Sequence, residues 1–467
     1  MHSNREFQGL ALTGARSAHC RAVLVAGAIV GLSGCGQSPA TADKENVRAI
    51  PPPGENRVSV SPADMDAARS LGARSTRDEP LTAEELAHKD RLEAELAAER
   101  PTHQLKLRDG RALDGRVVAE TPSTIRFRDG FGYSGFVVES YRRADVLTVE
   151  TLPPASFQVT PRDVRFSAEF PRFHFVKRPP YTVVTDESYG EVQKILDVLT
   201  SLREQFRRRF GPLIKQDGAL QDIDVVFFGS EEAFRVYALR IAPSFVNSAG
   251  FYSSGENRLA LLNQLGTSRY TLAQDRLDQR RHMFSGSAEA GPQLAALRSD
   301  ITSEAKSMNE RLIRHEGAHQ LFHAYRIHSR YGLEPTWLTE GLAQYCETAD
   351  IGRCHALLAN RVTRARKAGQ LLPLKKLLNH RDSSGFFALG EGNVELAYAE
   401  SWALVYMLMQ DDSRAPFFDY VKSYRDISND RAAAAVEQAQ PETLLEAQLK
   451  TDFKSLERKW DSFITHM

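Results

Sequence analysis

The chain has 467 residues, in which 60 basic residues balance 60 acidic residues, and hydrophobic residues make up 42%. This length is enough for one large domain and a smaller one, and the hydrophobic content suits a soluble globular core. The lack of net charge argues against nucleic-acid binding and against electrostatic attachment to an anionic membrane.

The N-terminus has the pattern of a signal peptide over residues 1–34. Basic residues at positions 5, 16 and 21 precede an apolar stretch of roughly eleven residues, too short to span a bilayer as a helix. The stretch ends in "LSGC" (residues 32–35), which resembles a bacterial lipobox and implies acylation of Cys35. We therefore predict an exported protein, lipid-anchored to the membrane through Cys35 on the periplasmic or extracellular face of the cell envelope. An ordinary secretory signal with an incidental cysteine is the alternative.

Residues 35–102 are predicted to be a linker that contains one charged helix. The helix, over residues 81–100, begins with Thr82 and has Glu85 three residues later, which is the pattern of a capping box. We interpret this region as a tether that holds the rest of the protein away from the membrane. A helix docked on the folded part is the alternative.

Residues 103–152 alternate apolar and polar side chains between Asp-Gly turns, which predicts four or five short strands. The segment resembles the small SH3-like or Sm-like β-barrels of bacterial envelope proteins. It contains no cluster of catalytic residue types, so we expect a module for interaction or positioning. A Pro-rich linker is predicted over residues 153–175.

Residues 176–467 predict an α+β domain. A strand over residues 181–188 and a helix over 189–211 are followed by a buried strand (222–230) and a hairpin (250–263). A long charged helical stretch (273–310) then leads to the sequence "RLIRHEGAHQLFH".

That sequence contains the HExxH pattern, with His315, Glu316 and His319. Residues i and i+4 face the same side of a helix, so both imidazoles can bind one zinc ion while Glu316 reaches a water on the metal. Two histidines packed in a core are the alternative. His323 continues the i+4 series, but successive steps drift around the helix, and we interpret it as a packing residue.

A third zinc ligand is available downstream. Zinc with two histidine ligands takes a third protein ligand and leaves one position for water. Glu340 lies 21 residues after His319, in a predicted helix that begins near Pro335. If the chain turns back after the first helix, this carboxylate can complete the site.

Here the sequence resembles the gluzincin metallopeptidases, in which HExxH is followed by a glutamate in the pattern W-L-x-E-G-x-A. "WLTEGLA" (residues 337–343) matches this pattern at every position. The resemblance implies that His315, His319 and Glu340 bind Zn²⁺ and that Glu316 is the general base. From about residue 181 onward, roughly three-fifths of the chain, it also resembles an uncharacterised bacterial family of secreted gluzincin-like proteins. The matching segments are "AGFY", "HEGAHQL", "PTWLTEGLAQY", "ANRVTR" and "AYAESWALVYML".

The resemblance also implies a mixed sheet before the HExxH helix and a mostly helical C-terminal part. It makes the segment 258–262 ("RLALL") our candidate for the edge strand that lines a substrate, and Tyr398 our candidate for stabilising the oxyanion. Glu347 or Glu400 could orient a ligand histidine, and the sequence does not choose between them.

Two further predictions concern the region after the motif. Cys346 and Cys354, eight positions apart in an oxidising compartment, predict a local disulfide, with two buried free thiols as the alternative. Arg361 and Arg364 could bind a substrate carboxylate, although a solvated helix face is the default interpretation.

The leading functional hypothesis is therefore a membrane-anchored zinc metallopeptidase that acts on a peptide or protein substrate. A non-catalytic, zinc-stabilised binding lipoprotein of the cell envelope is the first alternative. Zinc-dependent hydrolysis of a non-peptide bond, such as a cell-wall amide, is the second.

Overall fold

The computed structural model describes residues 80–467, all within one compact unit. Not described within this range are residues 100–101, 130–136, 153–158, 172, 179, 215–222, 242, 255, 284–289, 329–333, 382–385, 387–390 and 426–438. The predicted signal peptide, Cys35 and most of the linker that follows it lie outside the described residues. Among the residues described, no helix has the length and apolar character needed to cross a membrane.

The charged helix predicted near residue 81 is α3 (Ala83–Glu99). Its capping box is present, since the Thr82 N–H donates to the Glu85 carboxylate (2.8 Å) and the Glu85 N–H donates to the Thr82 hydroxyl (3.2 Å). Glu85 also pairs with Arg165 of α4 (Pro161–Ala168) at 3.3 Å, and Leu92 is buried in a small apolar cluster that includes Val164. α3 therefore fits the alternative prediction, a helix docked on the folded part, better than the prediction of a free tether.

The same contacts correct the prediction of a linker over residues 153–175, because α4 lies within it. The Thr160 hydroxyl caps α4 by accepting from the Asp163 N–H (3.2 Å), and the Asp163 carboxylate accepts from the Thr160 N–H (2.8 Å). Asp163 is buried and pairs with Lys177 at 2.5 Å. A segment with its own cap and a buried ion pair is part of the folded domain.

Residues 103–151 form the predicted short strands, but they do not form a closed barrel. The strands are β1 (His103–Leu107), β2 (Ala112–Glu120), β3 (Thr124–Asp129), β4 (Val137–Arg142) and β5 (Val146–Thr151). They form one antiparallel sheet in the order β4-β3-β2-β1-β5. In the described part of this sheet β4 and β5 are unpaired edges, so the prediction of an SH3-like or Sm-like barrel is not borne out. What remains of the prediction is a five-stranded sheet with its own small core around Leu105 and Phe127.

The second sheet is mixed, as predicted for the region before the HExxH helix. It comprises β6 (His174–Arg178), β7 (Tyr181–Thr185), β8 (Ile223–Phe228), β10 (Arg258–Leu262) and β9 (Gly250–Ser253), in that spatial order. β7, β8 and β10 are parallel, whereas β6 and β9 are antiparallel to their neighbours.

This order corrects the predicted edge strand. The segment 258–262 is an inner strand between β8 and β9, and the edge next to it is β9. The hairpin was predicted correctly, but its two strands were assigned the wrong way round. Every residue of β10 is buried, whereas β9 has two partly exposed residues, as the difference between an inner and an edge strand requires.

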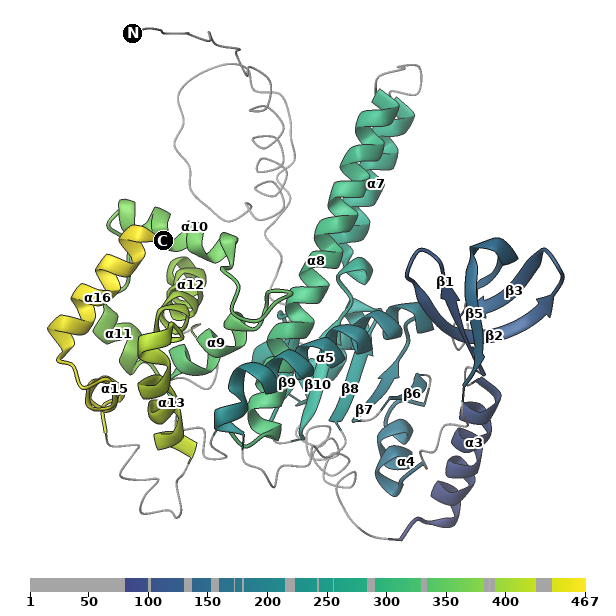
Figure 1. Ribbon diagram of the computed structural model, residues 1–467, viewed down its shortest axis with the longest axis horizontal. Coiled ribbons are helices and arrows are strands. Elements are labelled where there is room, and N and C mark those ends of the chain that lie inside the picture. The colour runs from purple at the N-terminus through teal and green to yellow at the C-terminus, as the bar shows by residue number, and fades with distance from the viewer. Residues whose placement is uncertain are drawn as a thin grey trace, which may run out of the picture. The chain divides into compact units, whose positions relative to one another are not determined.

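Helices cover both faces of the mixed sheet (Figure 1). One face packs against α5 (Tyr189–Phe210) and α8 (Ala290–Ala324), through a cluster that includes Val225 and Leu199. The opposite face packs against α4 and α6 (Glu231–Ile241), through a cluster that includes Val226 and Phe234. Consecutive strand residues point to opposite faces, which is why these buried strands are apolar throughout.

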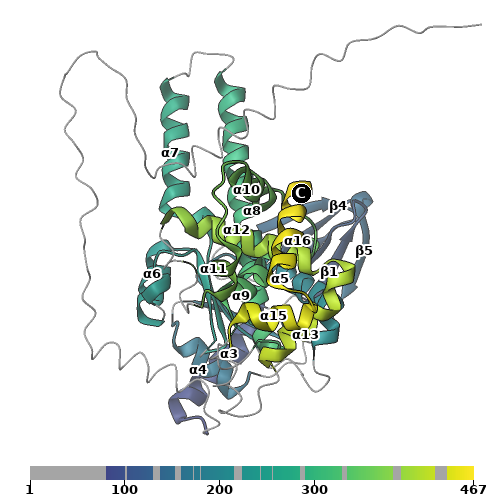
Figure 2. The ribbon, with the colours of Figure 1, turned by 90° about the vertical axis from the view of Figure 1, so that its left-hand side faces the viewer.

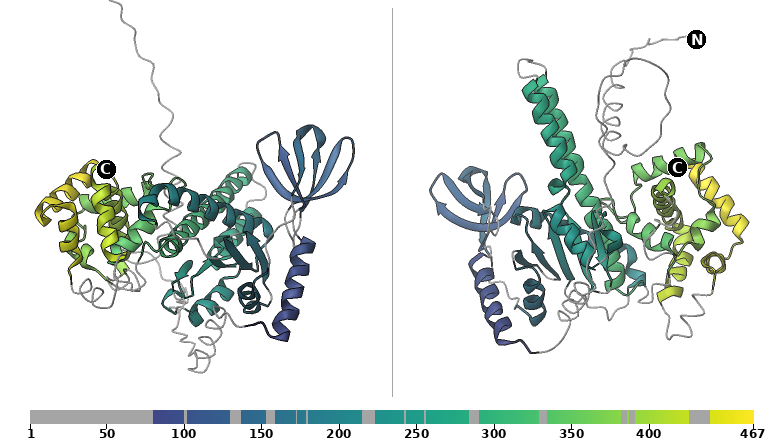
Figure 3. Two further views of the ribbon diagram at one scale, coloured as in Figure 1. Left: turned by 60° about the horizontal axis from the view of Figure 1, so that its bottom comes forward. Right: turned by 180° about the vertical axis from the view of Figure 1, so that it is seen from behind.

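The predicted charged helical stretch is an antiparallel hairpin of α7 (Ser268–Met283) and the first half of α8, which lie side by side in every view (Figures 1, 2 and 3). The Tyr270 hydroxyl lies 3.0 Å from the Thr302 hydroxyl across this pair. Below the hairpin, the Asn309 side chain bonds both the Gln264 N–H (2.8 Å) and the Asn263 side chain (2.7 Å) just after β10. α8 is therefore fixed to the end of an inner strand.

The C-terminal part is helical, as predicted. Its helices are α9 (Thr336–Tyr345), α10 (Ala356–Lys367), α11 (Leu374–Asn379), α12 (Glu391–Leu408), α13 (Asp411–Arg425), α15 (Pro441–Leu449) and α16 (Phe453–His466). They share the largest apolar cluster of the described chain with the ends of α5 and α8.

Glu400 of α12 gives this core a predicted pH dependence. Its buried carboxylate accepts the Leu372 N–H (2.9 Å), and burial raises its pKa from 4.5 to about 7. The folded protein thus keeps a proton that the unfolded chain releases, so this contribution to stability is full below about pH 4.5 and is lost as the pH rises through 7. The loss amounts to about 3 kcal/mol.

The unfolding free energy of the wild type should therefore fall by about this much between pH 5 and pH 8 because of Glu400. Urea unfolding at the two pH values should show that Glu400→Gln removes this part of the fall. Glu395→Gln, at an exposed position of the same helix, is the control, and an equal effect of Glu400→Gln at both pH values would contradict the prediction.

Candidate metal centre

The second half of α8 positions His315 and His319 against the sheet. Two of the three residues between them, Gly317 and Ala318, are small, and a Cβ atom on Gly317 would lie 2.9 Å from side-chain atoms of both Leu199 and Leu202 in α5. Gly317 therefore lets the two helices approach closely on one side of α8. The histidines, one turn apart, project together from another side of the helix.

A second close helix contact positions Glu340. A Cβ atom on Gly341 would lie 2.5 Å from the Ser401 carbonyl oxygen of α12, so only glycine allows α9 and α12 this contact. Trp337 of α9 is fully buried and stacks on Tyr420 with ring centroids 5.9 Å apart. These contacts fix the position of α9, and the Glu340 side chain extends from α9 toward the two histidines.

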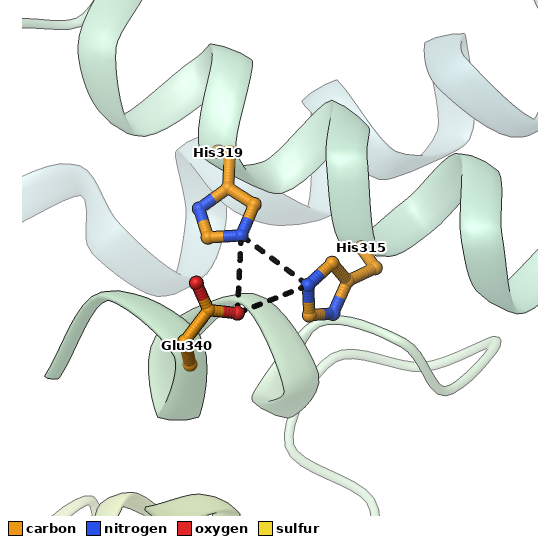
Figure 4. A group of neighbouring side chains, drawn as sticks. All are labelled: His315, His319 and Glu340. Carbon is orange, nitrogen blue, oxygen red and sulfur yellow. Dashed lines mark hydrogen bonds and ion pairs between the residues drawn. The ribbon is translucent and has the colours of Figure 1, made fainter. Parts of the chain in front are cut away.

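The three predicted ligand residues converge. The Nε2 atoms of His315 and His319 lie 3.2 Å apart, and a carboxylate oxygen of Glu340 lies 3.3 Å from the first and 3.5 Å from the second (Figure 4). No other group of His, Cys, Asp and Glu side chains in the described part of the chain comes together in this way. This group could hold a metal ion.

The chain turns back between the two ligand helices, as the sequence requires. After α8 ends at Ala324, Arg326 adopts a left-handed conformation (φ 53°), and the Ile327 N–H donates to the Phe322 carbonyl (2.8 Å). Residues 329–333 of the predicted turn lie outside the described residues. The chain continues from Pro335 into α9, where the Thr336 N–H donates to the His380 carbonyl (2.9 Å).

The pKa values of His315 and Glu340 are set by burial and by the charged groups close to them. Burial lowers the pKa of His315, but hydrogen bonds with Glu340 and Glu347 outweigh it and raise that pKa well above 6.5. Burial raises the pKa of Glu340, but the neighbouring His319 and His315 hold it well below its usual range. The side chains remain 15–16% exposed, so an ion can enter from solvent. It must then displace the proton of His315, so metal binding releases a proton.

Of the two predicted candidates, Glu347 is the carboxylate that contacts one of these histidines. One of its oxygens lies 2.8 Å from Nδ1 of His315, on the ring side away from Glu340. A proton on Nδ1 leaves the Nε2 lone pair directed at the site. The other predicted candidate, Glu400, bonds the backbone of Leu372 instead.

Cys346 and Cys354 flank this carboxylate as free thiols, so the predicted disulfide is wrong. The alternative holds for Cys346, which is buried, and burial raises its thiol pKa. Cys354 is exposed.

Glu316 lies beside the three ligand candidates and next to the sheet edge. Burial raises the pKa of its carboxyl, the two histidines oppose this, and the Tyr252 N–H of β9 donates a hydrogen bond to it. Tyr252 stands opposite Leu259, and three pairs along the ladder the Leu262 N–H donates to the Ala249 carbonyl (2.9 Å). Hydrogen-bonded and non-hydrogen-bonded pairs alternate in an antiparallel ladder, so Tyr252 and Leu259 form a non-hydrogen-bonded pair. Because alternate residues of an edge strand turn their backbone groups outward, the Tyr252 N–H points away from β10, toward α8.

Tyr398 of α12, the predicted oxyanion donor, is in electrostatic range of the site. Burial raises the pKa of its hydroxyl, and the charges of Glu340 and Glu316 raise it further. Its ring packs edge-on against Phe386 at 5.1 Å. The hydroxyl therefore remains protonated and can donate.

Other predicted residues do not join the group. His323 packs between the rings of Tyr252 and His328, each 5.4 Å away, which agrees with its interpretation as a packing residue. Burial lowers its pKa to about 4, so it is neutral. Arg361 pairs with Glu395 of α12 at 2.6 Å, and both side chains are largely exposed.

Sequence reasoning missed two histidines near the site. His355 bonds Glu347 at 3.2 Å. His328 is buried against Phe322, and neither of its ring nitrogens has a hydrogen-bond partner among the described residues. Neither residue continues the helical spacing of the motif, so periodicity could not identify them.

A family of proteins matches the region that contains this site. The profile of a family described as "Protein of unknown function (DUF1570)" matches residues 311–430. The match covers the end of α8 that carries the two histidines, all of α9, and α12 with Tyr398. No curated protein matches the chain.

The site predicts that metal binding depends on Glu340. Glu340→Ala should weaken binding of Zn²⁺ or Co²⁺ at least about 100-fold, because loss of a direct ligand should cost no less than loss of an outer-shell partner. Competition with a chromophoric chelator measures this affinity, and Glu395→Ala is the matched control. Retention of the wild-type affinity by Glu340→Ala would reject this carboxylate as a ligand.

Proposed function

We propose that this protein is a zinc-dependent metallopeptidase of the cell envelope, anchored through Cys35. The observation that carries the proposal is the convergence of His315, His319 and Glu340 with a further carboxylate, Glu316, beside them. The resemblance to gluzincins supports the same ligand set. The lipid anchor is supported by the sequence of the N-terminus alone.

Zinc is the metal that fits the donor set best. Two imidazoles and one carboxylate, with a remaining position for water, form a common catalytic zinc set. The spacings of 3.2, 3.3 and 3.5 Å between donor atoms are close to the edge of a tetrahedron with bonds of about 2.0–2.1 Å. The donors therefore need only small shifts to accept the ion.

A bound zinc ion would lower the pKa of a coordinated water and polarise a carbonyl group. Glu316 would act as the general base: its carboxylate would take a proton from the attacking water and pass it to the leaving amine. Its raised pKa suits both steps, since a carboxyl that titrates closer to neutral can accept and release a proton at working pH. The hydrogen bond from Tyr252 holds the carboxylate in place between these steps.

The free edge of β9 supports a peptide as the substrate. Gly250 and Tyr252 turn backbone groups outward from the sheet, and this edge has no strand partner among the described residues. The Tyr252 N–H donates to Glu316 and the Gly250 carbonyl accepts the Ser248 hydroxyl (2.9 Å), so the Gly250 N–H and the Tyr252 carbonyl are the groups that a peptide could bond. An extended peptide can add to such an edge by backbone hydrogen bonds. A peptide bound there would run past Glu316, because Tyr252 already contacts that carboxylate.

Tyr398 supports the same reaction from α12. Negative charge develops on the scissile carbonyl oxygen as water adds, and a protonated hydroxyl held in a buried setting can stabilise that charge. Its location within range of both Glu316 and Glu340 suits this role.

The decisive experiment compares the wild type with Glu316→Gln. Both proteins should bind one zinc ion per chain, because Glu316 is not among the proposed ligands. Cleavage of a quenched fluorescent peptide library should occur only with the wild type, at a rate at least about 100-fold higher. Equal cleavage by the two proteins would refute the assigned base. Zinc binding with no cleavage of any peptide by the wild type would favour a binding lipoprotein instead.

Tyr398→Phe tests the oxyanion donor separately. We expect kcat to fall about 10- to 1000-fold with little change in KM, since the lost hydrogen bond forms mainly in the transition state. Tyr406→Phe, a change on the same helix away from the ligands, is the control. An unchanged kcat in Tyr398→Phe would assign Tyr398 to packing alone.

A further inference from the structure

We propose that His355 is a positioning residue of the metal centre, which acts on His315 through Glu347. The proposal rests on the proposed function, because it concerns the ligand set of that site. It adds an outer residue that is neither a metal ligand nor a group that touches substrate.

The first observation is that Glu347 bridges two imidazoles. One carboxylate oxygen lies 2.8 Å from Nδ1 of His315, and the other lies 3.2 Å from Nε2 of His355. The side chains of all three residues are at least 85% buried. With both oxygens engaged, the carboxylate cannot rotate about its terminal bond without breaking a hydrogen bond in a poorly solvated site.

The second observation is that the backbone of His355 leaves its ring free for this contact. His355 is the N-cap residue of α10, a position where side chains usually accept a backbone N–H, yet its side chain makes no such bond. The ring instead packs edge-on against Trp402, with centroids 6.2 Å apart. Trp402 and Glu347 therefore fix the ring from two directions.

The third observation is that the loop between Glu347 and His355 is tied down at several points. Buried Arg314, next to His315 in sequence, donates to the Cys346 carbonyl (2.9 Å). Gln205 of α5 donates to the Ala349 carbonyl and accepts the Ile351 N–H, both at 2.8 Å. The separation of His355 and Glu347 is thus fixed by backbone contacts.

The consequence lies in the orientation of His315. The Nδ1 proton held by Glu347 fixes the tautomer in which Nε2 offers its lone pair to the metal. His355 fixes the second oxygen of that carboxylate, so the first oxygen is aimed before any ion arrives. A preorganised ligand loses less conformational entropy on binding.

Two substitutions of similar size separate this role from packing. His355→Gln keeps a side-chain N–H that can reach Glu347, whereas His355→Met fills the same space without a donor. Arg353→Ala, at an exposed position of the same loop, is the matched control. Thermal unfolding of the metal-free proteins checks that each variant is folded.

Affinity for Zn²⁺ alone, measured by chelator competition, is the first readout. We expect His355→Met to bind about 10-fold more weakly than the wild type, at the lower end of the range for outer-shell partners, and His355→Gln to remain within about 3-fold. The visible spectrum of the Co²⁺-loaded proteins is the second readout, because it reports the ligand geometry. His355→Met should alter it, and His355→Gln and Arg353→Ala should not.

The outcomes distinguish this inference from the proposed function. Wild-type affinity and spectrum in both His355 variants would overturn the inference and leave the metallopeptidase proposal standing. Equal loss in both variants would also overturn it, since the donor would then be irrelevant. Failure of the wild type itself to bind Zn²⁺ or Co²⁺ would overturn both.

Discussion

The site depends on two places where a pair of helices packs unusually closely. α8 meets α5 at Gly317, and α9 meets α12 at Gly341, and neither position has room for a Cβ atom. Each glycine directly follows a glutamate of the site. The backbone next to Glu316 and Glu340 therefore lies against a neighbouring helix, and its position is fixed by that contact. A larger residue at either position would separate the helices and move His315, His319 and Glu340 apart by more than a metal site tolerates.

This constraint joins two parts of the fold that differ in character. The histidines belong to a helix that packs on a mixed sheet, and Glu340 belongs to the helical C-terminal part. The two parts share one apolar cluster that contains the end of α8, so the donor atoms are brought to within 3.5 Å by core packing. The charged groups alone could not do this, because burying them opposes their ionised forms.

Local patterns in the sequence were enough to predict the helices and the ligand group. The capping box at Thr82, the i,i+4 histidines and the glutamate in "WLTEGLA" are short-range signals, and the structure has them where they were expected. One error is a local helix, α4, missed inside a predicted linker, and the others concern which segments pair with one another. Strand order placed β9 rather than β10 at the edge, a five-stranded sheet stayed open, and two cysteines eight residues apart remained unbonded. The contact between His355 and Glu347 could not be predicted from local patterns either, because contacts from α5 and α8 position the loop that carries His355.

The continuity of α8 has a consequence for how this chain can vary. Its 35 residues run without a break from the hairpin with α7 to His315 and His319. An α-helix turns by about 100° per residue, so inserting one residue between Thr302 and Asn309 would turn the face that α8 presents to α7 by that angle. α7 could not follow, because its first residue, Ser268, donates its N–H to Glu231 (2.8 Å), and the contact between Tyr270 and Thr302 would be lost. The pairing of the two helices of the hairpin thus depends on the number of residues in α8, independently of the chemistry at its other end.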